Sequence, residues 1–299
     1  MNKLFVPPIK SQGIKTKLVP WINDTIARSG VDRATSTWIE PFFGTGVVGF
    51  NAGFKNNVVG DTNPHIINFY NSVKSGEINH YIAREYFTKQ DVLLQNAGYD
   101  HYRYIRDRFN ESFSPLDFIF LSRAGFNGMM RFNSKGKWNI PFCKKPNRFA
   151  PAYITKICNQ IKGVESTISN YEWEFETINY IDTINRAKPN DFIYCDPPYY
   201  GRYVDYYNGW TEQNEDDLFK ALSSTKAKFV LSTWHHNNYR ENEMVAKYWS
   251  RFNIITKDHF YHSGGKLENR QSVVEALVFN FDLKDIDNSE RDLFSQINM

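Results

Sequence analysis

The stretch "YCDPPYYGR" (residues 194–202) ends an apolar run with an acid, two prolines and two tyrosines. Proline cannot donate to a β-ladder, and the residue before it avoids the α region. Residues 191–196 therefore predict a buried strand that stops abruptly at Asp196. A strand that stops in this way presents an acid and aromatic rings at the edge of a sheet.

Other short apolar runs lie on both sides of this strand. Residues 35–40 and 56–61 precede it, and residues 228–234 follow it, as expected of a parallel sheet covered on both faces. Residues 273–281 alternate between apolar and polar, as in the arm of an antiparallel hairpin. We therefore expect an α/β fold with a doubly wound, mostly parallel, Rossmann-like sheet.

Helical patterns dominate the middle of the chain and interrupt the series of strands. We expect a mainly helical module at residues 66–170, inserted into a domain made of residues 1–65 and 171–283. Residues 284–299 are polar and form a C-terminal tail. In doubly wound sheets ligands bind beyond the carboxyl ends of the strands, near the switch point, so motifs at those ends are expected to share one site.

Composition excludes several classes of protein. The chain has 299 residues, a net charge of +3 and three cysteines without a CxxC pair, which favours a reducing compartment and no structural zinc. No apolar run approaches the length that crosses a bilayer. Residues 121–150 carry seven Lys or Arg, no Asp or Glu, four Phe and one Trp. This pattern is typical of a surface that binds a phosphate backbone, and the alternative is a solvated basic loop.

The glycine loop "GTGVVG" (residues 44–49) formally matches the dinucleotide fingerprint. An apolar strand does not directly precede the glycines, because Glu40, Pro41 and two phenylalanines intervene. Asp61 lies fifteen residues beyond Gly46, short of the expected spacing of about twenty. A carboxylate at this strand end suits a ribose diol, and Glu40 suits a ligand that carries an ammonium and a sulfonium. The loop therefore favours S-adenosylmethionine (AdoMet) over a nicotinamide dinucleotide.

The four residues after the central strand suit the methylation of an exocyclic amine. The Asp196 carboxylate and the Pro197 carbonyl provide two adjacent acceptors for the amine's N–H groups, and the prolines, including Pro198, hold them rigidly. Tyr199 can stack on a base that has been flipped out of the duplex. One alternative is a surface turn that merely ends a strand. Another is methylation of RNA or of a protein amide, because Asn/Asp-Pro-Pro-Tyr turns serve those reactions too.

With these motifs in order, the chain resembles the Dam-type (alpha-group) adenine-specific DNA methyltransferases over about residues 5–281. The resemblance rests on five blocks: "PPIKSQGIKTKL", "IEPFFGTGVVGFN", "GDTNPHIINFYN", "FNGMMRFNSKGKWNIPF" and "YCDPPY". Within the family it is most similar to the modification methylases of restriction systems that read GATATC, through "SQGIKTKLVP", "PFCKKPNRFA" and "STWHHN". It departs from the family where many members have Trp-Ala-Gly-Gly-Lys and this chain has Ser11 to Lys15.

The resemblance implies roles for individual residues. Asp196, Pro197, Pro198 and Tyr199 are the implied catalytic residues. The implied AdoMet contacts are Gly13, Lys15, Glu40, Phe42, Gly44, Gly46, Asp61, Tyr180 and Asp196. The implied DNA contacts are Lys10, Phe126 as a wedge in the base stack, Asn127, Met129, Arg131 and Asn133. Arg131 suits the two acceptors of a guanine edge.

For three further features the sequence predicts no direct part in catalysis. His235 and His236 resemble a metal or acid–base pair, but neighbours on an extended strand point to opposite faces, so we expect a structural or DNA-proximal role. Cys195 is expected to point into the core. Residues 264–271 are expected to form a loop near DNA, with Arg270 at a phosphate.

We expect a cytoplasmic enzyme that methylates adenine N6 in a short palindrome of double-stranded DNA, with AdoMet and no metal. It would act as a monomer, alongside a restriction endonuclease that shares the site without binding it. The alternatives are an amino methyltransferase acting on RNA or a protein amide, a nicotinamide oxidoreductase, and a DNA-binding protein that has lost catalysis.

Overall fold

The structure is built around a seven-stranded sheet. The computed structural model describes residues 4–11, 13–201, 209–260 and 272–285. Within these residues the strand order is β3-β2-β1-β4-β5-β7-β6. The strands are β1 (Thr37–Glu40), β2 (Asn56–Asp61), β3 (Glu172–Thr177), β4 (Phe192–Cys195), β5 (Lys228–His236), β6 (Asn253–Phe260) and β7 (Ser272–Phe279).

The order of these strands confirms the doubly wound α/β fold. Strands β3, β2, β1, β4 and β5 run parallel, and β7 lies antiparallel between β5 and β6. The chain builds outward from β1 to β2 and β3, and then returns to the other side of β1 as β4. The switch point of the sheet therefore lies between β1 and β4, where Trp38 pairs with Phe192.

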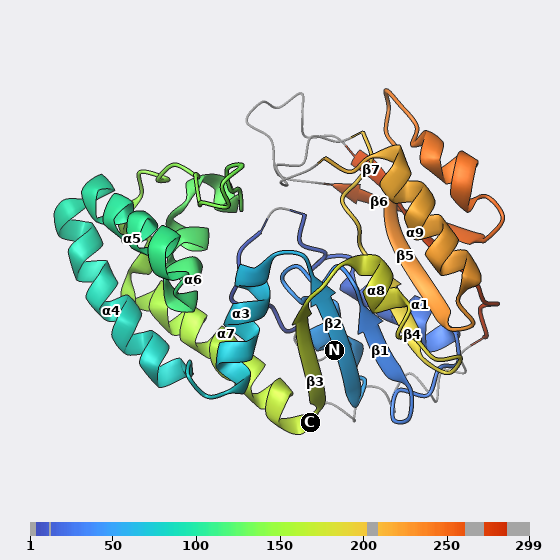
Figure 1. Cartoon of the computed structure of the whole chain (residues 1–299), viewed down its shortest axis with the longest axis horizontal. Helices are drawn as coiled ribbons and strands as arrows, with labels where there is room; N and C mark the ends of the chain where they lie inside the picture. Colours follow the sequence, from blue (N-terminus) through green and yellow to red (C-terminus); the bar gives the residue numbers. More distant parts are fainter. Residues whose placement is uncertain (1–3, 12, 202–208, 261–271, 286–299) are drawn as a thin grey trace.

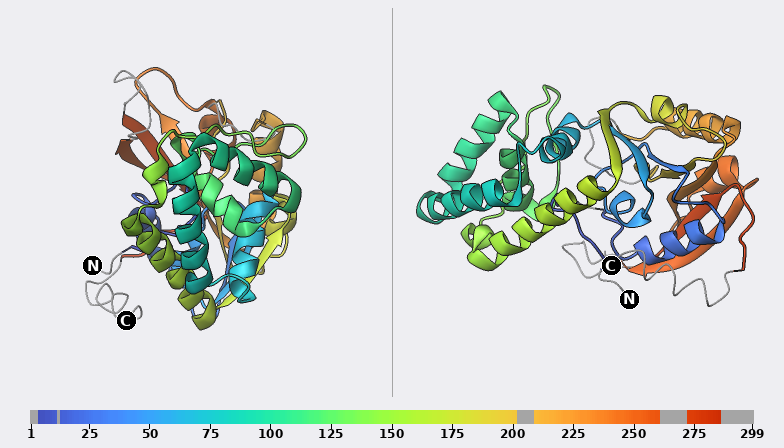
Figure 2. Two further views of the ribbon diagram at one scale, coloured as in Figure 1. Left: turned by 90° about the vertical axis from the view of Figure 1, so that its left-hand side faces the viewer. Right: turned by 90° about the horizontal axis from the view of Figure 1, so that it is seen from below.

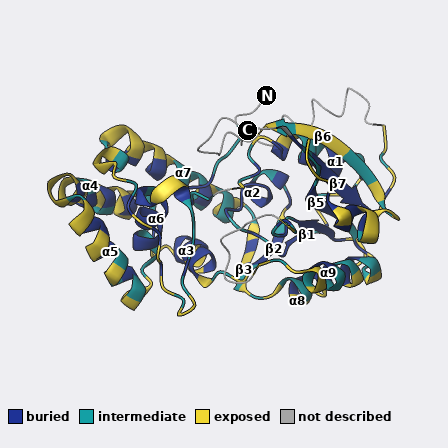
Figure 3. Cartoon of the chain, turned by 90° about the horizontal axis from the view of Figure 1, so that it is seen from above, coloured by how far each residue is buried: buried dark blue, intermediate teal, exposed yellow. Residues whose placement is uncertain are grey.

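Alternate side chains of the central strands enter two separate cores, because successive residues of a strand point to opposite faces. Trp38 and Tyr194 stack on one face with their ring centroids 5.7 Å apart. Ile39 and Cys195 lie on the other face, so Cys195 is buried in the core as predicted. Helices α1 (Val19–Arg28) and α2 (Gly49–Ala52) cover the first face, and α8 (Tyr180–Ile184) and α9 (Glu212–Ser224) cover the second (Figure 3).

A group of helices lies at one end of the molecule, beside β3 (Figure 1). It comprises α4 (His80–Ala97), α5 (Tyr99–Ser112), α6 (Pro115–Ala124) and α7 (Pro151–Asn170), which follow α3 (Pro64–Lys74). α7 runs from this group to the edge of the sheet, where β3 begins (Figure 2). The apolar core of the helices is continuous with the core on the α1 face of the sheet.

An ion pair joins two helices of this group, and a loop with two short helices completes it. Asp117 on α6 is fully buried and accepts bonds of 2.7 and 2.5 Å from Arg108 on α5, which ties these helices together. Between α6 and α7 the chain forms a compact loop, which contains η1 (Phe126–Gly128) and η2 (Pro146–Phe149). A bridge between Phe132 and Trp138 closes a small hairpin within it. In the described residues no helix has the length and apolarity needed to cross a membrane.

Candidate active site

Sequence-distant residues meet at the carboxyl ends of β1, β2 and β4. Asp196 directly follows β4, and its carboxylate lies 2.7 Å (Oδ1) and 2.9 Å (Oδ2) from Lys15 Nζ, although 181 residues separate the two in the chain. Lys15 is only 6% exposed and Asp196 is 22% exposed, so the pair joins a buried ammonium to a partly accessible carboxylate. The structure thus brings together the N-terminal block and the Asp-Pro-Pro-Tyr turn that the sequence singled out.

The environment of Asp196 raises the pKa of its carboxyl group. Burial raises the pKa of Asp196, the charge and hydrogen bond of Lys15 lower it, and the charge of Glu275 raises it. The burial effect is the largest, so the pKa lies above its ordinary value. Lys15 therefore favours the ionised form of Asp196.

Tyr199 is nearly buried and is contacted at its hydroxyl and over its ring. Its hydroxyl donates to Glu275 Oε2 at 2.5 Å, and Lys15 Nζ lies 4.8 Å from the centre of its ring. The side chain is 9% exposed and packs with Trp234 and Val273. Sequence reasoning predicted Tyr199 but missed Glu275, which lies on β7 and carries no motif.

The backbone after Tyr199 is also fixed from β5. Trp234 Nε1 donates to the Tyr200 carbonyl at 3.2 Å, and Arg240 donates to the Gly201 carbonyl at 2.8 Å. Arg240 also lies 5.0 Å above the Trp234 ring. The turn that carries the predicted catalytic residues is therefore attached to two strands other than its own.

The glycine loop is shaped by backbone geometry and by Asp61. Gly44 and Gly46 have φ values of +52° and +74°, which L side chains rarely adopt. The Asp61 carboxylate accepts from the Gly44 N–H at 2.8 Å and from the Asn63 N–H at 2.8 Å. Burial raises the pKa of Asp61, while the Asn63 and Gly44 N–H groups lower it. Each carboxylate oxygen retains a lone pair for a ligand.

Glu40 lies beneath the glycine loop. It is the last residue of β1, and the pleat turns its side chain toward the first core, where it is 2% exposed. Its Oε2 accepts from Trp38 Nε1 at 2.9 Å, and a Cβ at Gly49 would lie 2.4 Å from the same oxygen. Burial raises the pKa of Glu40 well above its ordinary value.

Three aromatic rings form a wall at the end of β1. Phe42 stacks on Tyr180 with a centroid distance of 5.1 Å, and the edge of Trp210 lies 5.7 Å from Phe42. Trp210 Nε1 donates to the buried Glu215 at 2.5 Å, which fixes the indole. The sequence predicted Phe42 and Tyr180 but missed Trp210, whose only signal is its place just before the N-cap of α9.

The N-terminal segment links the glycine-loop region to the helical group. Gly13 is exposed with φ +76°, and its carbonyl lies 3.5 Å from Lys15 Nζ. Lys10 lies against Gly128 in the loop after α6, where a Cβ would meet Lys10 Cε at 2.8 Å. Burial lowers the pKa of Lys10, and the neighbouring Arg148 lowers it further. Lys10 therefore lies within the basic surface that the sequence predicted.

The other predicted DNA contacts lie on this same loop. Phe126 is 48% exposed, and Asn127 is exposed with φ +53°. Met129 is half-buried and packs against the core, while Arg131 Nε donates to Asn139 Oδ1 at 3.1 Å. Asn133 uses its side-chain oxygen within its own turn, to accept from the backbone of residues 135 and 137 at 2.9 and 3.1 Å.

The expectation that His235 and His236 point to opposite faces is wrong. A bulge between Trp234 and His236 breaks the alternation of β5, and the two Nδ1 atoms lie 2.8 Å apart. Burial and the charge of His236 lower the pKa of His235. In the part of the chain that the structure describes, no three His, Cys, Asp or Glu side chains are placed to hold a metal.

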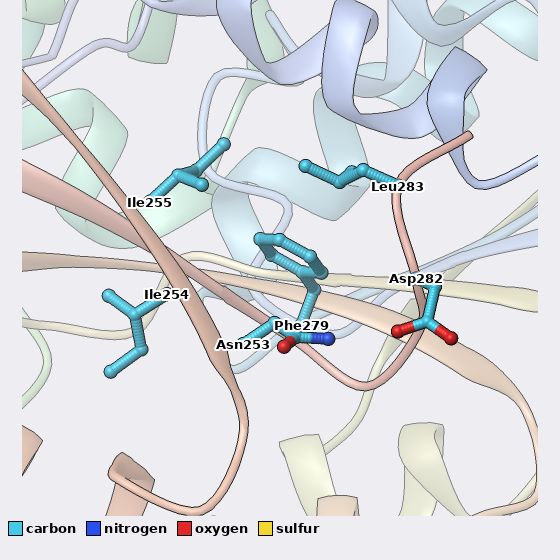
Figure 4. A pocket seen from close by; sticks show the side chains of 6 residues that line it. All are labelled: Asn253, Ile254, Ile255, Phe279, Asp282 and Leu283. Carbon is cyan, nitrogen blue, oxygen red and sulfur yellow. The ribbon is translucent and has the colours of Figure 1, made fainter. Parts of the chain in front are cut away.

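A cavity of about 240 Å³ lies away from this site, on the β6–β7 edge. It is lined by Asn253, Ile254, Ile255, Phe279, Asp282 and Leu283 (Figure 4). Two sequence expectations lie outside the described residues: the loop at residues 264–271 with Arg270, and residues 286–299 of the predicted tail.

Residues 11–263 match the family of D12 class N6 adenine-specific DNA methyltransferases, and the chain belongs to this family. It is therefore an adenine-specific DNA methyltransferase, in agreement with the main functional prediction over the RNA, protein and nicotinamide alternatives.

The chain is similar in sequence to several proteins that are named as DNA adenine methylases or type II methyltransferases. The chain is 35% identical over 249 residues to a DNA adenine methylase of Vibrio cholerae, covering 80% of this chain and 86% of the relative. It is 26% identical to the type II methyltransferase M.MjaIII of Methanocaldococcus jannaschii, covering 92% and 99%. It is also 26% identical to the type II methyltransferase M.FokI of Planomicrobium okeanokoites, covering 94% of this chain but only 43% of M.FokI.

Proposed function

We propose that this enzyme transfers a methyl group from AdoMet to N6 of an adenine that is flipped out of a short palindrome in duplex DNA. The observation that carries the proposal is the ion pair of buried Lys15 and partly accessible Asp196 at the end of β4. It lies at the switch-point edge of the sheet, as does the glycine loop bound by Asp61. Ligands of doubly wound sheets bind at this edge.

The charges at the edge fit a cationic cofactor. Asp61, Asp196 and Glu275 lie at this edge, and Lys15 forms an ion pair with Asp196. A ligand with a positive charge relieves this excess of carboxylates, and a pyrophosphate would add to it. AdoMet, when bound, supplies a methyl group on a sulfonium. Asp61 would hold its ribose hydroxyls, and the rings of Phe42 and Tyr180 would contact its adenine.

The chain's own residues then act on the target amine. Asp196 and the Pro197 carbonyl accept its two N–H bonds, which draws the nitrogen lone pair out of conjugation with the ring. Because the two prolines and the bonds to Tyr200 and Gly201 fix this turn, the acceptors need no rearrangement in the transition state. The raised pKa of Asp196 also suits it to take the proton that the amine loses.

The helical insertion supplies DNA recognition in this proposal. Residues 66–170 form the target-recognition module, and residues 1–65 with 171–283 form the AdoMet-binding domain. Exposed Phe126 is the wedge that replaces the flipped base in the stack, and Arg131 reads a guanine edge. The sites Lys10, Asn127, Met129 and Asn133 contact bases or phosphates.

The particular palindrome is proposed from resemblance. The stretches "SQGIKTKLVP" and "PFCKKPNRFA" support GATATC over GATC. We further propose that the enzyme acts as a cytoplasmic monomer, since a palindrome can be modified one strand at a time. A restriction endonuclease would share the site without forming a complex with the methyltransferase.

The test is transfer of labelled methyl from AdoMet to unmethylated genomic DNA, followed by single-molecule mapping of modified bases. Asp196→Ala is the catalytic control, and a cooperative thermal unfolding transition shows that the variant retains its fold. We expect label at the adenine of one palindrome and its loss in Asp196→Ala. Label at GATC, or at several unrelated sites, would contradict the GATATC proposal, and transfer that persists in Asp196→Ala would contradict the mechanism.

A further inference from the structure

We infer that Glu275 is a positioning residue for Tyr199, which holds the phenol ring in the orientation that receives the flipped adenine. This inference rests on the function proposed above, because it assigns Tyr199 to the target base. In this inference Glu275 acts through the hydroxyl of Tyr199.

The contact itself is short and buried. Tyr199 Oη donates to Glu275 Oε2 at 2.5 Å, and Glu275 is 1% exposed. A hydrogen bond to a charged acceptor is shorter and about twice as strong as one between neutral groups. Water competes poorly at a site this closed, so the bond is maintained while the pocket exchanges ligands.

The position of Glu275 in the sheet makes it a rigid anchor. It lies on β7, where it pairs with Trp234 on β5 and with Lys257 on β6, so strands flank it on both sides. Its carboxylate therefore holds a nearly constant place relative to the sheet. Tyr199, by contrast, lies outside the strands, on the turn beyond β4.

Two fixed points then determine the plane of the Tyr199 ring. The backbone is fixed at one end by the Pro197-Pro198 turn, and the hydroxyl is fixed at the other end by Glu275. Without the second point, the orientation of the ring depends on its packing against Trp234 and Val273 and on the Lys15 ammonium, which lies 4.8 Å from the ring centre. A stacking surface is effective only while its plane matches that of the base.

Glu275 also lies close enough to Asp196 to influence its charge, since the charge of Glu275 contributes to the raised pKa of Asp196. A loss of activity in a Glu275 variant therefore has two explanations, a misplaced ring or an altered acid. The experiment must separate them, and a conservative substitution allows this.

The test measures flipping and catalysis separately in four variants. Duplex DNA with 2-aminopurine at the target adenine reports flipping by fluorescence, and single-turnover methyl transfer at saturating AdoMet reports chemistry. Glu275→Leu and Tyr199→Phe should each weaken the flipped state by about 10- to 100-fold, the range for a hydrogen bond to a charged group. Glu275→Gln keeps an acceptor oxygen but no charge, so it should restore most of the flipping signal lost in Glu275→Leu.

The double variant Glu275→Leu/Tyr199→Phe decides between action through the hydroxyl and independent action. We expect it to lose no more than either single variant, because both changes remove the same bond. Additive losses, or a normal flipping signal in Glu275→Leu, would overturn the inference. An acid limb of the rate profile that shifts in Glu275→Gln while flipping stays as poor as in Glu275→Leu would also overturn it, in favour of an electrostatic role.

The matched control is Asp191→Asn. Asp191 is a buried carboxylate at the opposite end of β4, where it accepts backbone N–H groups of Thr37 and Lys188. It should lower the melting temperature without changing flipping or methyl transfer. AdoMet affinity is measured for every variant, so that flipping and methyl transfer are compared at saturating AdoMet, and Asp191→Asn should leave this affinity unchanged. If the wild-type enzyme methylates no DNA, the proposed function fails; the Glu275 inference fails only when wild-type activity is present.

Discussion

Replacing Lys15 by Met should shift the acid limb of the activity profile to higher pH. Lys15 is the cation that opposes the effect of burial on Asp196, at a distance of 2.7 Å. An opposite charge within about 4–6 Å lowers the pKa of a carboxyl group by about 1–3 units. Removing it should therefore raise the pKa of Asp196 further, so that a smaller fraction of the enzyme carries the ionised acid at a given pH.

The sign of the effect follows from the role of the acid. Asp196 must be ionised to accept two N–H bonds, so activity is lost as the pH falls through its pKa in the folded enzyme. Because that pKa is already above its ordinary value, ionisation of Asp196 also costs folding stability as the pH rises. Lys15→Met increases this cost, so the variant should be least stable relative to wild type at high pH.

The assay is the pH dependence of kcat/KM for AdoMet, which reports the ionisations of the free enzyme. Lys17→Met is the control, since Lys17 is an exposed lysine two residues away. An unmoved acid limb in Lys15→Met, with a uniform fall in rate at every pH, would refute the electrostatic reasoning. Lys15 would then serve only to contact the cofactor.

Three other substitutions test separate parts of the structure. Asp61→Asn places an amide donor against the Gly44 or Asn63 N–H, so AdoMet should bind about 10- to 100-fold more weakly by calorimetry, with little change in kcat at saturation. Phe126→Ala should reduce 2-aminopurine fluorescence at the target while the free energy of unfolding stays within about 0.5 kcal/mol of the wild-type value, because the ring is exposed. Gly49→Ala should destabilise the fold by about 1–3 kcal/mol in thermal or urea unfolding, since its Cβ would meet the Glu40 carboxyl at 2.4 Å; equal stability would mean that β1 and α2 separate freely.

Local patterns were enough to predict the central sheet. β2 has the predicted bounds, residues 56–61, and β4 lies within the predicted run that ends at Asp196. The antiparallel character of β7 was also read correctly from its alternation. β3 and β6 were missed because β3 has only two buried rings among glutamates, Trp173 and Phe175, and β6 is a largely exposed edge strand. Such strands depend on the neighbour with which they pair, which a local window does not contain.

The residue types of the site were determined by the sequence itself. The Asp-Pro-Pro-Tyr turn, the glycine loop and Asp61 each carry a chemical reason for their composition that is visible without coordinates. Family membership, which five ordered blocks indicated, belongs to the same level, because order along the chain is a property of the sequence.

Only the tertiary structure decided which charges and rings meet. Lys15 reaches Asp196 across 181 residues, Glu275 reaches Tyr199 across 76, and the indole of Trp210 closes the wall begun by Phe42. It also brought His235 and His236 together through a bulge and turned Glu40 into the core. Partners, burial and pKa depend on three-dimensional distance and solvent access, and these are determined by the way the strands and helices pack.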